Sequence, residues 1–69
     1  MTRRQRQLDE LRGLCSIGAI ARSIDLAYEH FADFGPDDDI PILIAEAMEH
    51  AEVSDGIRRR FAELLASQR

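Results

Sequence analysis

Glu46 and His50 are the residues of this 69-residue chain whose types and spacing best fit a pair of metal ligands. They stand four positions apart, so on a helix they share one face, with Glu49 beside them. Glu29 and His30 could oppose them across a helical hairpin. Di-iron bundles use Glu-x-x-His pairs, and that spacing does not occur here. We therefore expect exposed helix polarity at these positions, with no metal ion and no other cofactor.

Asp37, Asp38 and Asp39 form the chain's one aspartate run, between its two prolines, Pro36 and Pro41. A calcium loop alternates its ligands and carries a following glycine, and the run has neither feature. Carboxylates that precede a helix lie at the positive end of its dipole, where aspartate is a good N-cap. The run therefore predicts helix capping by Asp38 or Asp39, with Pro41 inside the first turn.

Cys15 is the single cysteine, which excludes a disulfide within the chain. It stands among apolar residues and far in sequence from both histidines, so a small buried hydrophobe is expected rather than a nucleophile. The sequence has no Gly-rich phosphate loop and no serine in an elbow. We expect no catalytic residue and no enzyme. A lone cysteine with no secretory signal favours a reducing cytoplasm.

Arg58, Arg59 and Arg60 form the densest basic cluster, and Arg3, Arg4 and Arg6 form a second one. Because successive helical residues are about 100° apart, three consecutive arginines fan around the helix and cannot all face one ligand. Solvated helix faces are the expectation, with contact to an acidic partner or a phosphate as the alternative. The net charge of −4 argues against a general nucleic-acid binder.

Residues 17–34 have the apolar and small spacing of a degenerate helix-turn-helix, with Asp25 at the turn position where glycine is usual. The second helix would carry Glu29 and Asp33 and no arginine, which is the wrong sign of charge for DNA phosphates. The same spacing fits an amphipathic helix. DNA binding is therefore kept as the alternative function.

The elements that must hold these residues are all helical. Apolar side chains recur at alternating steps of three and four, in a row that predicts one long helix over residues 6–34. The row consists of Leu14, Ile17, Ala21, Ile24, Tyr28 and Phe31. Residues 1–5 are expected to be a disordered arm, and residues 35–39 a turn that folds the chain back.

After the turn the sequence predicts a second, antiparallel helix over 40–53 and a short third helix over 54–68. The apolar phase slips at Ser54, Asp55 and Gly56, which favours Ser54 or Asp55 as a new N-cap. A single helix kinked at Gly56 is the rival interpretation. The whole chain is expected to form one small all-α domain, with no segment long and apolar enough to span a membrane.

Residues 8–31 would span roughly 35 Å as a helix, whereas residues 40–53 reach only about 20 Å. Either the third helix or a second chain must cover the remainder. We expect a homodimeric helical bundle with the row from Leu14 to Phe31 at its interface. The basic residues are all arginine, and the chain has no Lys, Asn or Trp, which indicates a GC-rich bacterial or phage genome.

The function hypothesis is a small non-enzymatic protein that acts as a regulator, adaptor or inhibitor by binding another protein. The alternative is a small dimeric transcriptional regulator that binds DNA through its Arg-rich segments or through residues 17–34. The wide apolar row and the segregated charge favour the first. Its protein partner is not identified by the sequence.

Overall fold

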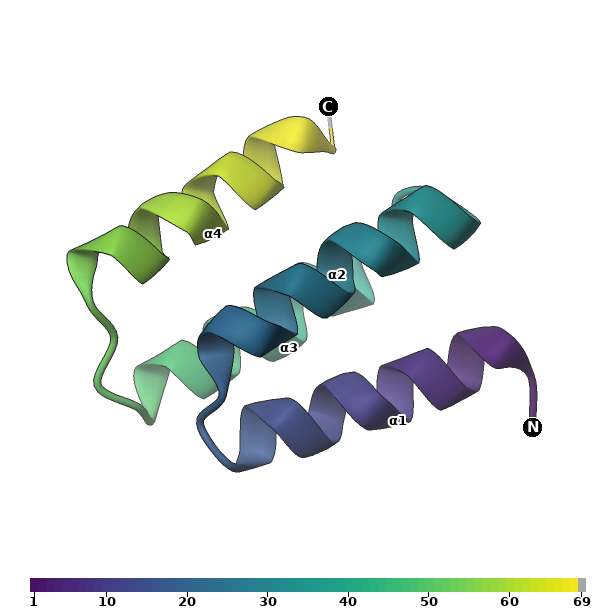
Figure 1. Ribbon diagram of the computed structural model, residues 1–69, viewed down its shortest axis with the longest axis horizontal. Helices are drawn as coiled ribbons and strands as arrows, with labels where there is room; N and C mark the ends of the chain where they lie inside the picture. The colour runs from purple at the N-terminus through teal and green to yellow at the C-terminus, as the bar shows by residue number, and fades with distance from the viewer. Residues whose placement is uncertain (69) are drawn as a thin grey trace.

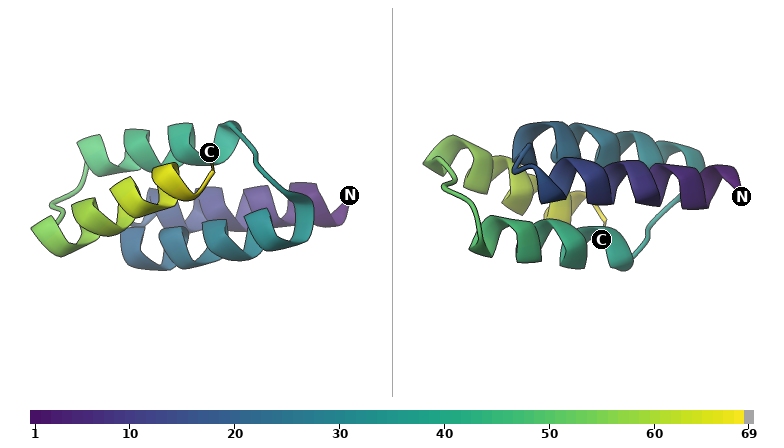
Figure 2. Two further views of the ribbon diagram at one scale, coloured as in Figure 1. Left: turned by 90° about the horizontal axis from the view of Figure 1, so that it is seen from above. Right: turned by 90° about the horizontal axis from the view of Figure 1, so that it is seen from below.

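Four helices make up the fold in the computed structural model, which describes residues 1–68. They are α1 (Arg3–Ser16), α2 (Ile20–Phe34), α3 (Asp39–Glu49) and α4 (Asp55–Ser67), and each runs roughly antiparallel to the one before it (Figure 1). Figure 2 shows α1 and α2 side by side, with α3 across one side of this pair. Helix α2 contacts all three other helices. The all-α class is confirmed.

The expected single helix over 6–34 is wrong, because the chain turns at Ile17, Gly18 and Ala19. Gly18 has a φ of 77°, a left-handed conformation that glycine adopts without steric cost. Its N–H donates to the Cys15 carbonyl at 3.1 Å, a bond that closes the end of α1. The apolar row continues across this turn without a break, which is why its spacing predicted one rod.

The expected disordered arm at residues 1–5 is also corrected, because α1 begins at Arg3. The Thr2 hydroxyl accepts a hydrogen bond from the Gln5 N–H at 3.1 Å and so caps the helix. Three of the five arm residues are therefore helical. This early start brings the first arginines of the chain beside the end of α2.

The connection between α2 and α3 runs over residues 35–38, close to the expected turn. Gly35 opens it with a φ of 83°. Asp38 occupies the N-cap position as predicted, but its side chain makes no capping bond. Asp37 supplies that bond, since its Oδ1 accepts from the Asp39 N–H at 3.2 Å. Pro41 lies in the first turn of α3, as expected.

Helices α3 and α4 are separate, so the rival interpretation of one helix kinked at Gly56 is wrong. Helix α3 ends at Glu49, four residues earlier than predicted, and the chain is not helical again until Asp55. Ser54 is the N-cap of α4, with its Oγ accepting from the Ile57 N–H at 3.2 Å, which confirms that prediction.

The core is small and draws on all four helices. Its buried apolar residues are Leu8, Leu11, Ile20, Ile24, Ala27, Ile40, Ile44 and Leu64. Full burial of each large side chain contributes about 1.5–3 kcal/mol. Of the described residues, Leu64 is the one in this list that α4 contributes, and α4 packs against α2. Within residues 1–68, no helix has the length and apolar character needed to cross a membrane.

Candidate functional site

A buried polar network surrounds His30 on α2. The ring is only 1% exposed. Its Nδ1 lies 2.9 Å from Oε1 of Gln7 on α1, and its Nε2 lies 2.9 Å from Oδ2 of Asp37 in the α2–α3 connection. One histidine therefore ties together three segments that are far apart in the sequence.

The partners of His30 are themselves held in place. The Gln7 Nε2 donates to Oδ2 of Asp33 at 3.2 Å, which turns the amide oxygen of Gln7 towards the ring. Both ring nitrogens therefore lie within hydrogen-bond distance of an oxygen, one of an amide and one of a carboxylate. The network thus holds the buried ring from both sides.

Asp37 is the acceptor at the centre of the network. Burial acts to raise the pKa of its carboxyl, but hydrogen bonds from His30, the Asp39 N–H and Arg4, with the charge of Arg4, outweigh it and lower that pKa. The Arg4 Nη2 lies 2.8 Å from Oδ2 of Asp37 and 3.5 Å from Oδ2 of Asp39. Asp37 is therefore ionised over the ordinary pH range.

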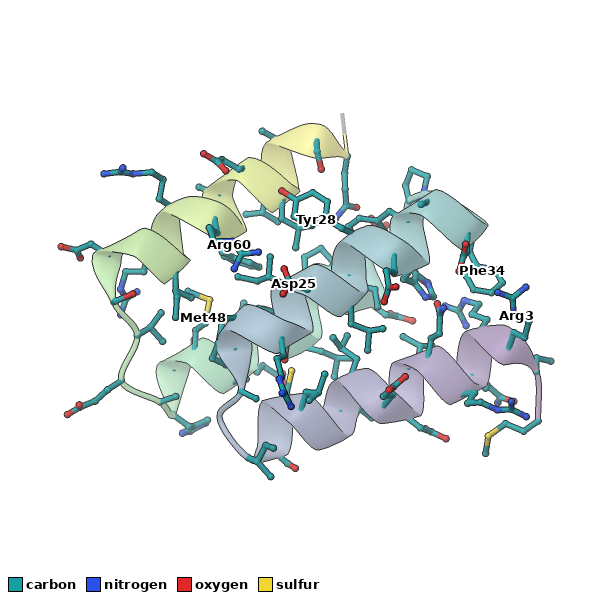
Figure 3. The ribbon with its side chains drawn as sticks, viewed as in Figure 1. Arg3, Asp25, Tyr28, Phe34, Met48 and Arg60 are labelled. Carbon is teal, nitrogen blue, oxygen red and sulfur yellow. The ribbon has the colours of Figure 1, made fainter. Side chains whose placement is uncertain are left out.

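Phe34 and Arg3 close the network from outside. The Phe34 ring centroid lies 5.0 Å from that of His30, and the Arg3 guanidinium carbon lies 5.8 Å from the Phe34 centroid (Figure 3). Arg3 also pairs with Asp33 at 3.5 Å. Both nitrogens of His30 are occupied and its ring is covered, so the arrangement suits structural bracing and leaves no atom free for acid–base chemistry.

From the sequence, the one role weighed for His30 was that of a metal ligand. A usable signal was present, because His30 continues the spacing of Ile20, Ser23 and Ala27, all of which are buried on α2. A histidine on such a face needs hydrogen-bond partners. Gln7 could not have been assigned to it without knowledge of the turn at Gly18.

The structure does not bring Glu29 and His30 to Glu46 and His50. His30 lies towards the end of α2, which leads into the start of α3, whereas Glu46 and His50 lie at the end of α3. No group of three or more His, Cys, Asp or Glu side chains within residues 1–68 converges as a metal-binding cluster.

Cys15 lines a shallow groove between the end of α1 and α3. The groove, of about 540 Å³, is also bordered by Arg12, Leu43, Glu46 and His50. Cys15 is half-buried, and its Sγ lies 3.6 Å from the Ser23 hydroxyl. The thiol packs against the core, as expected of a small apolar residue, but it is half-buried where the sequence predicted full burial.

A second groove, of about 560 Å³, separates α3 from α4. Its lining is mostly apolar, with one acid and one base at its edge: Ala45, Met48, Glu49, Ala51, Arg58 and Phe61. Figure 3 shows Met48 reaching from α3 towards the first half of α4. Glu49 and Arg58 are exposed, and neither forms an ion pair with any of residues 1–68.

Arg58, Arg59 and Arg60 fan around α4 as predicted. Arg60 points towards α2, where its Nη2 pairs with Oδ1 of Asp25 (Figure 3). Arg58 and Arg59 are exposed, and no ion pair joins either of them to the part of the chain that the structure describes. The three do not form one ligand-binding surface.

The predicted interface row does not form one surface, because the turn at Gly18 divides it. Ile24 is fully buried in the core of the single chain, and Phe31 packs against that core. Leu14 and Ala21 are half-buried, while Ile17 and Tyr28 are exposed by 76% and 39%. Ile24 therefore cannot contact a partner, and Ile24 and Phe31 contribute to packing within the single chain.

The degenerate helix-turn-helix over 17–34 is wrong as a structural prediction. The helix α2 continues without interruption through Asp25, the proposed turn position. Asp25 adopts no left-handed backbone conformation and pairs with Arg60 instead. Any DNA contact would have to come from other residues.

No protein-family model matches the chain, and neither the curated proteins nor the solved structures provide a match. The geometry of this chain is therefore the only guide to its function.

Proposed function

We propose that this chain is a small non-enzymatic protein that acts as a helical homodimer through protein–protein interaction, as a regulator, adaptor or inhibitor. The observation that carries this proposal is the face formed by α3 and α4. Two of its large apolar side chains, Ile42 and Leu65, are 57% and 41% exposed. They extend the apolar lining of the α3–α4 groove, and adjoining exposed apolar groups of this kind favour a protein partner.

The size of the chain supports the same proposal. A domain of this length buries only about 60% of the surface that its unfolded form exposes, so a partner adds stability that the small core cannot supply alone. Among residues 1–68, Leu64 is the one buried core residue of α4, while Ile57 and Phe61 pack against the core only half-buried, so this helix gains from further contacts.

Sedimentation equilibrium on the purified chain tests the proposal. We expect a dimer at micromolar concentration, with reversible dissociation on dilution. A monomer throughout that range would overturn the homodimer.

DNA binding as a dimeric transcriptional regulator is the alternative function. The exposed Arg58 and Arg59 favour it, while Arg3, Arg4 and Arg60 are already paired with carboxylates. A fluorescence titration with duplex DNA at two salt concentrations tests it, because phosphate contacts make affinity fall steeply with salt. If the chain does not bind duplex DNA even at the lower salt concentration, DNA binding is overturned.

A further inference from the structure

We infer that the α3–α4 face is the dimer interface, with α3 of each subunit lying over α4 of the other. This inference rests on the homodimer proposed above and adds the surface, the register and the charge pair that would set it.

Helical spacing gathers the exposed residues of this face into two rows. Ile42, Ala45 and Glu49 share one side of α3, at steps of three and four. On α4, Leu65 lies one heptad after Arg58, and Phe61 stands between them. Met48 and Phe61 are half-buried between the rows.

The antiparallel course of the two helices fixes which residues share an end of the face. Helix α4 runs back along α3 after the connection at residues 50–54 (Figure 2). Glu49, the last residue of α3, and Arg58, in the first turn of α4, therefore flank one end of the groove. Ile42 and Leu65 lie towards the other end. The face is charged at one end and apolar at the other.

A two-fold axis parallel to the helices makes this face self-complementary. Such a rotation preserves position along the helices and exchanges α3 with α4 across the interface. Glu49 then meets Arg58 of the partner subunit, and Arg58 meets Glu49 of the partner subunit. At the apolar end, Ile42 meets Leu65 of the partner subunit.

Glu49 and Arg58 favour the two-fold axis that is parallel to the helices over one that crosses them. A two-fold axis across the helices would place Glu49 on Ile42 of the partner subunit and Arg58 on Leu65 of the partner subunit. Both charges would then be desolvated against apolar groups, at a cost that no ion pair offsets. A second copy of the chain also suits this face better than an unrelated peptide. Each copy carries both Glu49 and Arg58 at the same groove, so two copies can form two ion pairs with each other.

Charge reversal tests the register. The variants are Glu49→Arg, Arg58→Glu and the double reversal, with dissociation constants measured by sedimentation equilibrium. Each single change places like charges opposite each other twice in the symmetric dimer, and we expect dimer affinity to fall about tenfold or more. The double reversal restores opposite charges, and its affinity should return to within a few-fold of the original.

Matched controls come from the same helix. Arg59→Glu and Glu63→Arg make the same changes of charge at exposed positions outside the two rows. They should leave the dissociation constant nearly unchanged. Circular dichroism of every variant checks that the helices are retained, because all four substituted side chains are exposed.

The outcomes separate this inference from the homodimer itself. If the dimer dissociation constant is unchanged by both single reversals, or is not restored by the double reversal, the α3–α4 register is wrong and the homodimer still stands. A wild-type chain that stays monomeric overturns both.

Discussion

Two groups of charged and polar residues in this molecule are organised in opposite ways. Around His30, each charged group has a partner, and the ring that joins them is buried. On the α3–α4 face, Glu49 and Arg58 border one groove, and neither is paired with any of residues 1–68. The first region braces the chain internally, while the second is left for contacts outside it. Stability and association should therefore respond to different residues.

The largest expected effect comes from removing the carboxylate beneath His30. Asp37→Ala leaves Nε2 of the buried His30 without its partner, removes the capping bond to the Asp39 N–H and breaks the ion pair with Arg4. The three losses together cost about 3–5 kcal/mol. In so small a domain this loss should leave much of the chain unfolded at ambient temperature. Urea denaturation followed by circular dichroism measures it.

Asp38→Ala is the matched control, because the neighbouring carboxylate is exposed and makes no side-chain hydrogen bond. Its free energy of unfolding should change by no more than about 0.5 kcal/mol. Equal losses in the two variants would show that the aspartate run acts through general charge rather than through the His30 network.

A pair of isoleucines on α3 separates stability from association. Ile44 is fully buried in the core, whereas Ile42, two residues away, is 57% exposed. Ile44→Ala should lower the free energy of unfolding by about 2–5 kcal/mol, since it removes buried methyl groups and leaves a cavity. Ile42→Ala should lower the stability of the monomer by about 0.5 kcal/mol or less.

The same pair has a second readout in the dimer dissociation constant. Ile42→Ala should raise it, because Ile42 lies on the proposed interface, and dilution series by sedimentation equilibrium measure the change. An Ile42 variant that dimerises as well as the wild type would remove the apolar end of the face from the interface.

The fold was only partly predictable from the sequence, and the His30 network was the part least open to prediction. The all-α class, Ser54 as an N-cap and the fan of arginines on α4 all follow from local patterns, and the structure bears them out. The break at Gly18 did not follow, because an apolar row keeps its period across a short turn. Without that break, Gln7 and Arg4 could not be placed beside His30, since antiparallel packing of α1 on α2 depends on it.

Acid should weaken the His30 network through Asp37. The pKa of this carboxyl is lowered in the folded protein, so its stabilising contribution is complete above the unfolded value of about 3.9. The contribution is lost as the pH falls below that value and through the folded pKa. The free energy of unfolding should therefore drop in this acidic range, as followed by urea titrations at successive pH values.

The control is Asp37→Asn, which cannot lose a charge there. Its stability should fall less steeply with acid than that of the wild type, and identical slopes would assign the acid sensitivity to other carboxyls.

The smallest expected effect belongs to the ion pair between Arg60 and Asp25. It joins α4 to α2 as the network joins α1 to α2, but its two side chains are 43% and 66% exposed. Water screens such a pair, and exposed ion pairs contribute about 0–1 kcal/mol. A double-mutant cycle with Arg60→Ala and Asp25→Ala should give a coupling energy within that range. A coupling several times larger would mean that exposure to water does not weaken this pair, and that it helps to hold α4 against α2.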